Sequence, residues 1–414
     1  MNGQSNKEFD LIVFGATSFV GKILCNYLVN EYREPNLTWA IAGRSEAKLN
    51  ELKQGLGARA ANLTLLLADS SDEASLAGLC SKTSVIISTV GPYALYGELL
   101  VKCCAQSGTD YCDLTGEPHW IRRMIQRYEA AAKGSGARIV HSCGFDSIPS
   151  DLGVMFLQNQ ALKRFGSYCP KVKMRVMALR GGASGGTIAS GINLYKEQAK
   201  DPALVSEMQD YYSICPRDHE SSVAQHTVDL EYDEDFNAWA GPFIMAGINT
   251  RIVLRSNAIR QSGCYSADFH YDEGTLTGSG AKGRKRAKRL AFGTRIAPKL
   301  LGNGLVRSVL TKFVLPKPGQ GPSPKEQLEG FYDLRFIGVT QSNQKIRIKV
   351  TGDRDPGYGS TAKMLTQAAL SLHRDVDKSA VAGGFWTPAT VFDEKLLERL
   401  RNFAGMRFEL DSEP

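Results

Sequence analysis

The first part of the chain alternates short apolar runs with amphipathic stretches. Residues 9–14 (FDLIVF) are almost all apolar, and from Gly21 to about Tyr32 apolar residues recur every four positions. The first pattern is typical of a strand buried on both faces of a parallel sheet, and the second indicates a helix with one apolar face. Further strand-like runs, separated by helical patterns, follow at 37–43, 63–69, 84–91, 110–116 and 137–144. The alternation predicts an α/β fold with a doubly wound parallel sheet over residues 1–150.

The pattern changes after a helix that we expect to begin near Pro149. Runs of alternating polar and apolar residues at 171–181, 250–260 and 264–271 predict strands of a largely antiparallel sheet. The stretch 333–353 predicts the hairpin that closes this sheet, with its turn near Ser342 and Asn343.

Three domains are expected from these patterns. A second, α+β domain for substrate binding and dimerisation would span 151–355. The remaining segment, 356–414, contains helical patterns at 360–373 and 393–403 and a strand-like run at 406–410. We expect these C-terminal elements to pack back on the first domain.

Composition narrows the class of protein. Hydrophobic residues make up 43% and charged residues 22% of the chain, as in globular proteins. No run approaches the roughly 20 apolar residues of a membrane span, and the first residues lack the pattern of a signal peptide, so a cytoplasmic protein is expected. Nine cysteines without a C-x-x-C pair and six scattered histidines favour neither a disulfide framework nor a metal site.

The positive charge is concentrated in one segment. Residues 274–325 contain twelve of the 50 Lys and Arg residues and no Asp or Glu, which leaves 38 basic against 43 acidic residues elsewhere. Within it, 282–317 combines basic residues with apolar residues every three or four positions, which predicts one or two basic amphipathic helices interrupted near Pro298 and near Gly302 to Gly304. The segment fits a solvated surface, an acyl-carrier protein or an anionic membrane surface, to which the protein would be peripheral. Because the basic residues are confined to this one segment, the charge pattern argues against a nucleic-acid-binding protein.

A glycine turn follows the first predicted strand directly. Gly15-Ala16-Thr17-Ser18-Phe19-Val20-Gly21 precedes a helix, and only a glycine-rich turn lets backbone N–H groups approach a pyrophosphate. The turn predicts dinucleotide binding and makes the parallel sheet one of the Rossmann type. The Ser18 hydroxyl fits phosphate contact and helix capping equally.

The end of the second strand indicates which dinucleotide binds. Where an acidic residue would hold the ribose of NAD, the chain has Gly43-Arg44-Ser45, with Lys48 one helical turn later. A guanidinium group suits a 2′-phosphate, so NADP(H) is expected. Asp69, at the end of the third strand, is a candidate for the adenine amine or for a helix cap.

Two further loops should lie beside the ribose and nicotinamide, because both follow strands at the carboxyl edge of the sheet. The loop residues expected to bind cofactor are Thr89, Val90, Gly91, Pro92, Tyr93, Cys143 and Gly144.

The motifs in these segments resemble the saccharopine dehydrogenase-like oxidoreductase family, most closely its branch of trans-acting enoyl reductases. GATSFVG, AGRS, STVGPYALYG, GTDYCDLTGE and CGFDSIPSDLG stand in family order within the first 153 residues, and the likeness resumes at 351–372 and 383–392. Ser18 departs from the family's usual glycine. The resemblance implies NADPH-dependent reduction of a carbon–carbon double bond in an acyl or polyketide-type lipid intermediate. For the saccharopine dehydrogenases proper, it would imply chemistry at an amino-acid carbon–nitrogen bond.

Hydride transfer leaves the protein to supply a proton donor and a group that orients the substrate. Tyr93 is the first candidate donor, with packing beneath the cofactor as the alternative, and Asp146 could orient the substrate. Asp113 and Glu117 fit a proton relay less well than capping of the turn and of the following helix. An exposed strand face explains the arginines of the second domain better than a clamp for a carboxylate substrate; they are Arg175, Arg180, Arg251, Arg255 and Arg260.

The sequence therefore predicts an NADP-dependent reductase, expected to form a homodimer. An amino-acid dehydrogenase of the saccharopine type and an NADP(H)-binding sensor or adaptor without turnover are the alternatives.

Overall fold

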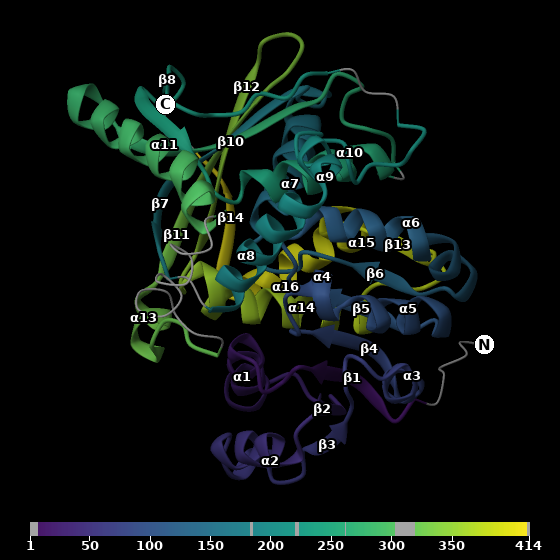
Figure 1. Ribbon diagram of the computed structural model, residues 1–414. Coiled ribbons are helices and arrows are strands. Elements are labelled where there is room, and N and C mark those ends of the chain that lie inside the picture. The colour runs from purple at the N-terminus through teal and green to yellow at the C-terminus, as the bar shows by residue number, and fades with distance from the viewer. Residues whose placement is uncertain (1–6, 183–184, 220–222, 261, 303–318, 412–414) are drawn as a thin grey trace.

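Two seven-stranded sheets organise the protein (Figure 1). The computed structural model describes residues 7–182, 185–219, 223–260, 262–302 and 319–411. In the first sheet all strands are parallel, in the order β13-β6-β5-β4-β1-β2-β3. These strands are β1 (Phe9–Phe14), β2 (Trp39–Gly43), β3 (Thr64–Leu67), β4 (Thr83–Ser88), β5 (Asp110–Asp113), β6 (Arg138–Val140) and β13 (Gly384–Trp386). The predicted Rossmann-type sheet is confirmed.

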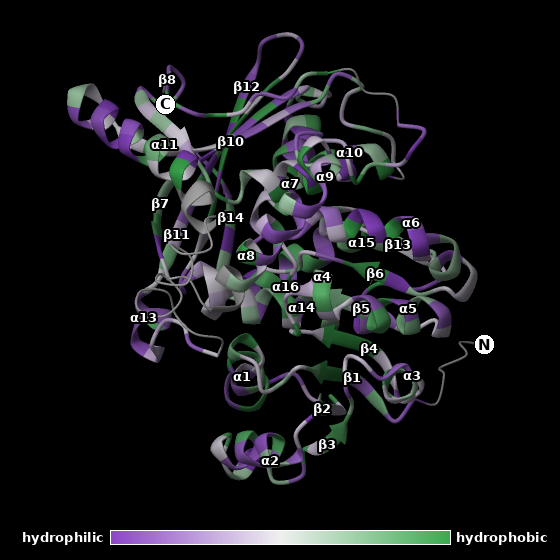
Figure 2. Ribbon diagram, in the orientation of Figure 1, coloured by the Kyte–Doolittle hydropathy of each residue, from purple (hydrophilic) through white to green (hydrophobic). Residues whose placement is uncertain are grey.

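Both faces of the first sheet are covered, as the apolar runs predicted. In β1, Leu11 and Val13 belong to one buried cluster, whereas Ile12 and Phe14 belong to another on the opposite face. Figure 2 shows the central strands as the most hydrophobic part of the sheet. The helices between the strands are α1 (Phe19–Asn26) with η1 (Tyr27–Glu31), α2 (Glu46–Gly55), η2 (Ala58–Ala60), α3 (Glu73–Lys82), α4 (Tyr93–Tyr96), α5 (Glu98–Ser107), α6 (Pro118–Ser135) and α7 (Ile148–Phe165).

The second sheet is mostly antiparallel, in the order β14-β12-β11-β7-β10-β9-β8, and only the pair β7 and β10 is parallel. Its strands are β7 (Lys171–Arg180), β8 (Glu231–Asp233), β9 (Ala238–Pro242), β10 (His270–Gly278), β11 (Phe331–Val339), β12 (Lys345–Gly352) and β14 (Met406–Leu410). The predicted hairpin is β11 and β12, and its turn includes Asn343 with a φ of 61°.

One expected strand of this sheet is a helix. The predicted strand 250–260 lies in α10 (Ala246–Ile259), and the run 264–271 becomes a strand only from His270. Residues 248–257 of α10 are all buried, so the helix shows no polar face that would reveal a helical period. Arg251 and Arg255 do not lie on an exposed strand face either. Arg251 donates to Met208 O at 2.6 Å, and Arg255 donates to Phe385 O at 2.7 Å.

The basic segment forms α11 (Gly280–Gly302), which runs through Pro298 without the predicted interruption. Residues 303–317 of the expected amphipathic segment lie outside the described residues. Figure 1 shows α11 extending from the body beside β9, and Ala287 and Ala291 are buried. Helices α8 (Gly185–Lys200) and α9 (Pro202–Glu207) also belong to this half of the chain. In the described residues, no helix is long and apolar enough to cross a membrane.

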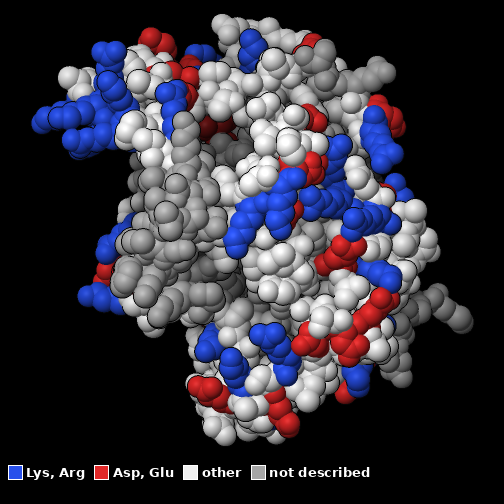
Figure 3. Space-filling view, viewed as in Figure 1, with Lys and Arg blue, Asp and Glu red and all other residues white. Residues whose placement is uncertain are grey.

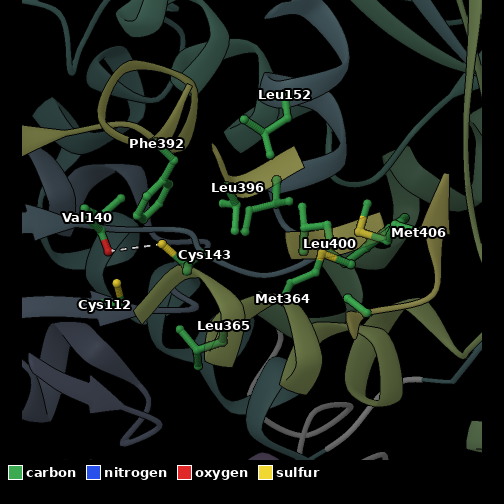
Figure 4. Close-up of a cluster of buried hydrophobic side chains, with 14 of the residues drawn as sticks. Cys112, Val140, Cys143, Leu152, Met364, Leu365, Phe392, Leu396, Leu400 and Met406 are labelled. Atoms are coloured by element: carbon green, nitrogen blue, oxygen red, sulfur yellow. Dashed lines mark hydrogen bonds between the residues drawn. The ribbon is translucent and has the colours of Figure 1, made fainter. Parts of the chain in front are cut away.

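The C-terminal segment contributes to both sheets. It contains η3 (Pro356–Ser360), α14 (Thr361–Arg374), α15 (Pro388–Phe392) and α16 (Glu394–Phe403) besides β13 and β14. A further helix, α13 (Pro324–Glu329), precedes β11. Strand β13 extends the first sheet by pairing with β6, and β14 pairs with β12 in the second. Figure 4 shows Leu365, Leu396 and Phe392 of these helices around Cys143 at the end of β6. This apolar core holds α14 against one face of the first sheet, with the start of the helix at the carboxyl edge and its end at the amino edge.

Candidate active site

The turn after β1 requires both of its outer glycines. Gly15 has a φ of +82°, and a Cβ there would lie 2.6 Å from Val90 Cγ2 and 2.9 Å from Thr89 Oγ1. A Cβ at Gly21 would lie 2.4 Å from the carbonyl oxygen of Gly15. No larger residue fits either position, since atoms this close must move apart. The turn therefore brings the backbone of β1 against that of the β4 loop.

The same turn leaves backbone donors available. Among the described residues, no acceptor bonds the amides of Thr17, Phe19 and Val20, which include the first two amides of α1. Ser18 Oγ accepts from Gly21 N at 3.0 Å and donates to Thr89 Oγ1 at 2.9 Å, so this hydroxyl caps the helix. Free amides at a helix N-terminus favour an anion, which fits a pyrophosphate.

The end of β2 presents cations without protein partners. Arg44 and Lys48 are exposed, and neither side chain makes an ion pair or hydrogen bond with a described residue. Ser45 caps α2 by accepting from Lys48 N at 3.4 Å. The Asp69 carboxylate accepts from Ser71 N and Ser71 Oγ at 2.9 and 2.7 Å, which lowers the pKa of Asp69. Asp69 thus stabilises its own turn, and the unpartnered guanidinium of Arg44 suits a 2′-phosphate.

The loop after β4 lies at the point where the strand order reverses, because β1 pairs with β4 on one side and with β2 on the other. Dinucleotides bind at such a point in open parallel sheets. Thr89 Oγ1 donates to Gly15 O at 2.8 Å, while Gly91 is exposed. The β4 loop and the glycine turn are therefore joined at the carboxyl edge of the first sheet.

Tyr93 lies beneath this edge rather than on it. Its side chain is 3% exposed, its hydroxyl donates to Ser88 O at 2.9 Å, and its ring packs against Trp120. Burial, together with the charge of Asp113, raises the pKa of Tyr93 well above its usual range. These contacts agree with the packing alternative for Tyr93.

Asp146 is a titratable group in the segment between β6 and α7. It is partly buried, and its carboxylate accepts no hydrogen bond from a described residue. A Cβ at Gly116, in the neighbouring loop after β5, would lie 3.5 Å from Asp146 Oδ2. Burial and, secondly, the charge of Asp113 raise the pKa of Asp146 to about 7. A carboxyl group with such a pKa can hold a proton at neutral pH.

The neighbouring Cys143 and Gly144 have structural roles. Cys143 is buried, its thiol donates to Val140 O at 3.5 Å (Figure 4), and burial raises the pKa of the thiol well above its usual range. A Cβ at Gly144 would lie 2.9 Å from Thr361 Cγ2, so the glycine permits close contact with α14.

Two carboxylates near the site hold loops. Asp113 Oδ1 accepts from Thr115 N and Ser142 N, and Asp113 Oδ2 lies 2.6 Å from His141 Nδ1. The expected capping of α6 by the side chain of Glu117 is wrong. Its carboxylate instead accepts hydrogen bonds from the backbone N–H groups of Tyr93 and Ala94 at the start of α4. Asp113 caps its turn, as expected.

The segment after β12 approaches the site from the other side, which local sequence patterns did not reveal. Thr361 Oγ1 accepts a hydrogen bond from Phe145 N at 2.9 Å. The rings of Tyr358 and Phe19 pack edge-on, with their centroids 5.1 Å apart. Asp355 accepts from Tyr358 N and Gly359 N, which shapes this turn. Proline and glycine in DPGYGS favour a turn, but only the fold places this segment beside the Gly15–Gly21 turn.

A parallel sheet with this strand order, a glycine turn at its reversal point and an unpartnered arginine after β2 define an NADP-dependent oxidoreductase. The sequence model of the saccharopine dehydrogenase NADP-binding domain matches residues 11–140. The fold is similar to saccharopine dehydrogenase (L-Glu forming) from Saccharomyces cerevisiae, with a TM-score of 0.53 and 11% identity over 97% of this chain and 99% of that one.

Closer relatives place the chain within that class. A Mycobacterium tuberculosis relative is 36% identical over 95% of this chain and 96% of its own length. Trans-acting enoyl reductases from Mycobacterium tuberculosis and Mycobacterium leprae are 35% and 34% identical, over 96% and 95% of this chain and 96% of theirs. The chain therefore belongs to the saccharopine dehydrogenase-like oxidoreductases, in the branch of trans-acting enoyl reductases. Its cofactor is NADP(H).

Proposed function

We propose that the protein reduces the carbon–carbon double bond of an enoyl thioester, as part of acyl or polyketide-type lipid assembly. The relatives' name, trans-acting enoyl reductase, supports the reaction class. The observation that carries the proposal is Asp146, a partly buried carboxyl group with a pKa of about 7 and no protein partner among the described residues, at the strand edge where the cofactor binds.

The proposed site divides the binding of the cofactor among the loops that follow the parallel strands. The amides of the Gly15–Gly21 turn bind the pyrophosphate, and Arg44 binds the 2′-phosphate with help from Ser45 and Lys48. The remaining cofactor contacts are assigned to Gly43, Thr89, Val90, Gly91 and Pro92. Asp69, Tyr93, Cys143 and Gly144 are engaged within the protein and are assigned to support of these loops. NADPH supplies the hydride when bound.

Asp146 is proposed as the proton donor. Reduction breaks the π bond, adds the hydride at the β-carbon and leaves an enolate of the thioester, which must take a proton at the α-carbon. A protonated Asp146 can supply it, and the Asp146 carboxylate then regains a proton from water. The Tyr93 hydroxyl is a poorer donor because its proton is bonded to Ser88 O. We assign Tyr93 to support of the β4 loop.

The structure favours this reaction over oxidation of an amino acid. A substrate with several carboxylates needs free arginines, but Arg175 lies 2.7 Å from Asp233 and 2.6 Å from Asp272, and Arg251 and Arg255 bond backbone carbonyls. A sensor without turnover would have no need of a carboxyl group poised to donate a proton.

The test is NADPH oxidation with enoyl thioesters of increasing chain length, with the product identified by a mass gain of two hydrogens. We expect activity that declines as the pH rises above about 7, where Asp146 loses its proton, and a loss of at least 100-fold in kcat for Asp146→Asn. NADPH binding should persist in the variant. Tight NADPH binding without turnover of any thioester would contradict the proposal and favour a sensor.

The surface of α11 supports a carrier-bound substrate. Figure 3 shows Lys and Arg side chains gathered over the far end of this helix. The exposed basic residues of α11 without an ion-pair partner in the described chain are Lys282, Arg284, Lys285, Arg286, Lys288 and Arg289, of which Arg284 lies over the ring of Trp239. The opposite, apolar face packs on β9, where a Cβ at Gly241 would lie 3.1 Å from Leu290 Cδ2. Leu290 is covered in this way, whereas Phe292 is exposed on the same helix, so α11 presents cations together with an apolar side chain. We propose an acidic acyl-carrier protein as the partner of α11.

A further inference from the structure

A single buried carboxylate joins the cofactor loop to the second half of the chain. Glu117 Oε1 accepts from Tyr93 N at 3.0 Å and from Ser190 Oγ at 2.8 Å, and Glu117 Oε2 accepts from Ala94 N at 2.9 Å. Glu117 is only 4% exposed. Its partners come from the start of α4, directly after the β4 loop, and from α8.

This arrangement calls for a carboxylate. Its three partners are all donors, and an ionised Glu is an acceptor at both oxygens. A Gln in this place would turn its amide donor toward a backbone N–H and lose at least one bond. Although burial raises the pKa of Glu117, the hydrogen bonds from Ala94, Ser190 and Tyr93 act in the opposite direction and favour the charged form.

Polar contacts link α8 to the first domain. None of residues 189–200 is fully buried. About two turns beyond Ser190, Glu197 Oε2 lies 3.0 Å from Arg123 Nη1. In α9, Glu207 Oε2 lies 3.5 Å from Arg122 Nη1. Elements with little buried apolar surface are the ones that open and shift at low cost in free energy.

We propose that Glu117 is a positioning residue that couples the β4 loop to α8, so that NADPH bound at the loop fixes α8 over the site and raises affinity for the acyl substrate. The part that concerns the substrate rests on the proposed function, whereas the coupling between NADPH and α8 does not. Coupling of this kind is reciprocal, so bound substrate also tightens NADPH binding.

Amide hydrogen exchange tests the coupling without turnover. In the wild-type protein, NADPH should slow exchange in residues 189–200 several-fold. In Ser190→Ala and Glu117→Gln, the slowing in α8 should disappear, while exchange in the Gly15–Gly21 turn should still slow in Ser190→Ala. Asn193→Ala is the matched control, because Asn193 donates only to Glu197 within α8, and should behave as the wild type. Slowing in α8 that survives Ser190→Ala would overturn the coupling.

Steady-state kinetics test the consequence for the substrate. Ser190→Ala should raise the KM for an enoyl thioester about tenfold, the value of one hydrogen bond to a charged group, with the Kd for NADPH changed less than twofold. Glu117→Gln should raise both constants, because it also releases the β4 loop. Equal effects of Ser190→Ala on both constants, or on neither, would contradict the proposal. If no thioester is reduced, the proposed function fails, and the exchange result decides the coupling alone.

Discussion

At the scale of single residues, the groups assigned to cofactor and substrate are those that the fold leaves unused. Arg44, Lys48 and Asp146 make no ion pair or side-chain hydrogen bond within the described chain. By contrast, Arg175, Arg251 and Arg255 are buried and fully engaged. Arg44 and Lys48 face water and are available to a ligand, whereas burial of Asp146 favours its protonated form. This contrast separates the functional cations from the structural ones.

The first prediction concerns the choice between NADPH and NADH. Arg44→Ala should weaken NADPH binding about 10-fold to 100-fold, because it removes charge-assisted hydrogen bonds to the 2′-phosphate, and should leave NADH binding nearly unchanged. Fluorescence titration with both nucleotides measures this. Lys48→Ala serves as a milder comparison and should cost less. An equal loss of affinity for both nucleotides would show that Arg44 does not bind the 2′-phosphate.

Several site residues could be found from the sequence because their roles depend on near neighbours. Gly15 and Gly21 belong to one turn, and Ser18 caps the helix three residues before its partner Gly21. Glu117 could not be assigned in this way. Its partner Ser190 lies 73 residues away, and no local pattern indicates that contact.

At the scale of elements, buried polar groups tie helices of distant origin together. Asp151, in the first turn of α7, accepts from Ser256 Oγ of α10 at 2.5 Å and from Ala389 N of α15 at 2.7 Å. Asp151 is 1% exposed, and burial raises the pKa of its carboxyl group to about 7. The junction of the three helices therefore contains a carboxyl group that favours its protonated form.

This junction predicts a dependence of stability on pH. An ordinary Asp in the unfolded chain has a pKa of about 3.9, so between about pH 4 and pH 7 the folded state binds a proton that the unfolded state has lost. The free energy of unfolding should therefore fall as the pH rises through this range and level off above about 7. Asp151→Asn, which can keep both hydrogen bonds, should make this fall less steep by about 1 kcal/mol per pH unit.

Urea unfolding of wild-type protein and Asp151→Asn at pH 5, 6 and 7 measures the difference. Asp146 contributes a slope of the same sign, so the variant should keep part of the dependence. Identical slopes for the two proteins would mean that Asp151 does not titrate in this range.

At the scale of the whole molecule, the charge is unevenly distributed. The chain carries a formal charge of +7, yet residues outside 274–325 carry 38 basic and 43 acidic side chains. Helix α11 concentrates exposed cations on one projecting element (Figure 3). A concentrated patch of this kind attracts an acidic partner over a distance set by the ionic strength.

The corresponding prediction separates an effect of α11 on binding of the carrier protein from an effect on the reduction itself. Lys285→Glu with Arg289→Glu should raise the KM for an acyl chain carried on an acidic carrier protein at least tenfold at low salt, and the difference should shrink as salt increases. The KM for a small soluble thioester should not change. Lys163→Glu with Lys171→Glu makes the same change in charge on another exposed surface and should have little effect. Binding of the wild type to anionic vesicles, lost in the α11 variant, would favour a membrane instead.

The sequence alone determined the parallel sheet, the glycine turn and the preference for NADP, because each depends on periodicity or on residues a few positions apart. The tertiary structure decided the rest. Helix α10 was mistaken for a strand because it is buried on every side, and β13 is three residues long and finds its partner β6 only after the chain has returned from the second sheet. The contact of Tyr93 with Trp120 and that of Glu117 with Ser190 also join residues far apart in the sequence, so the sequence did not reveal them. Such contacts exist only once packing has brought remote segments together, and no local pattern encodes them.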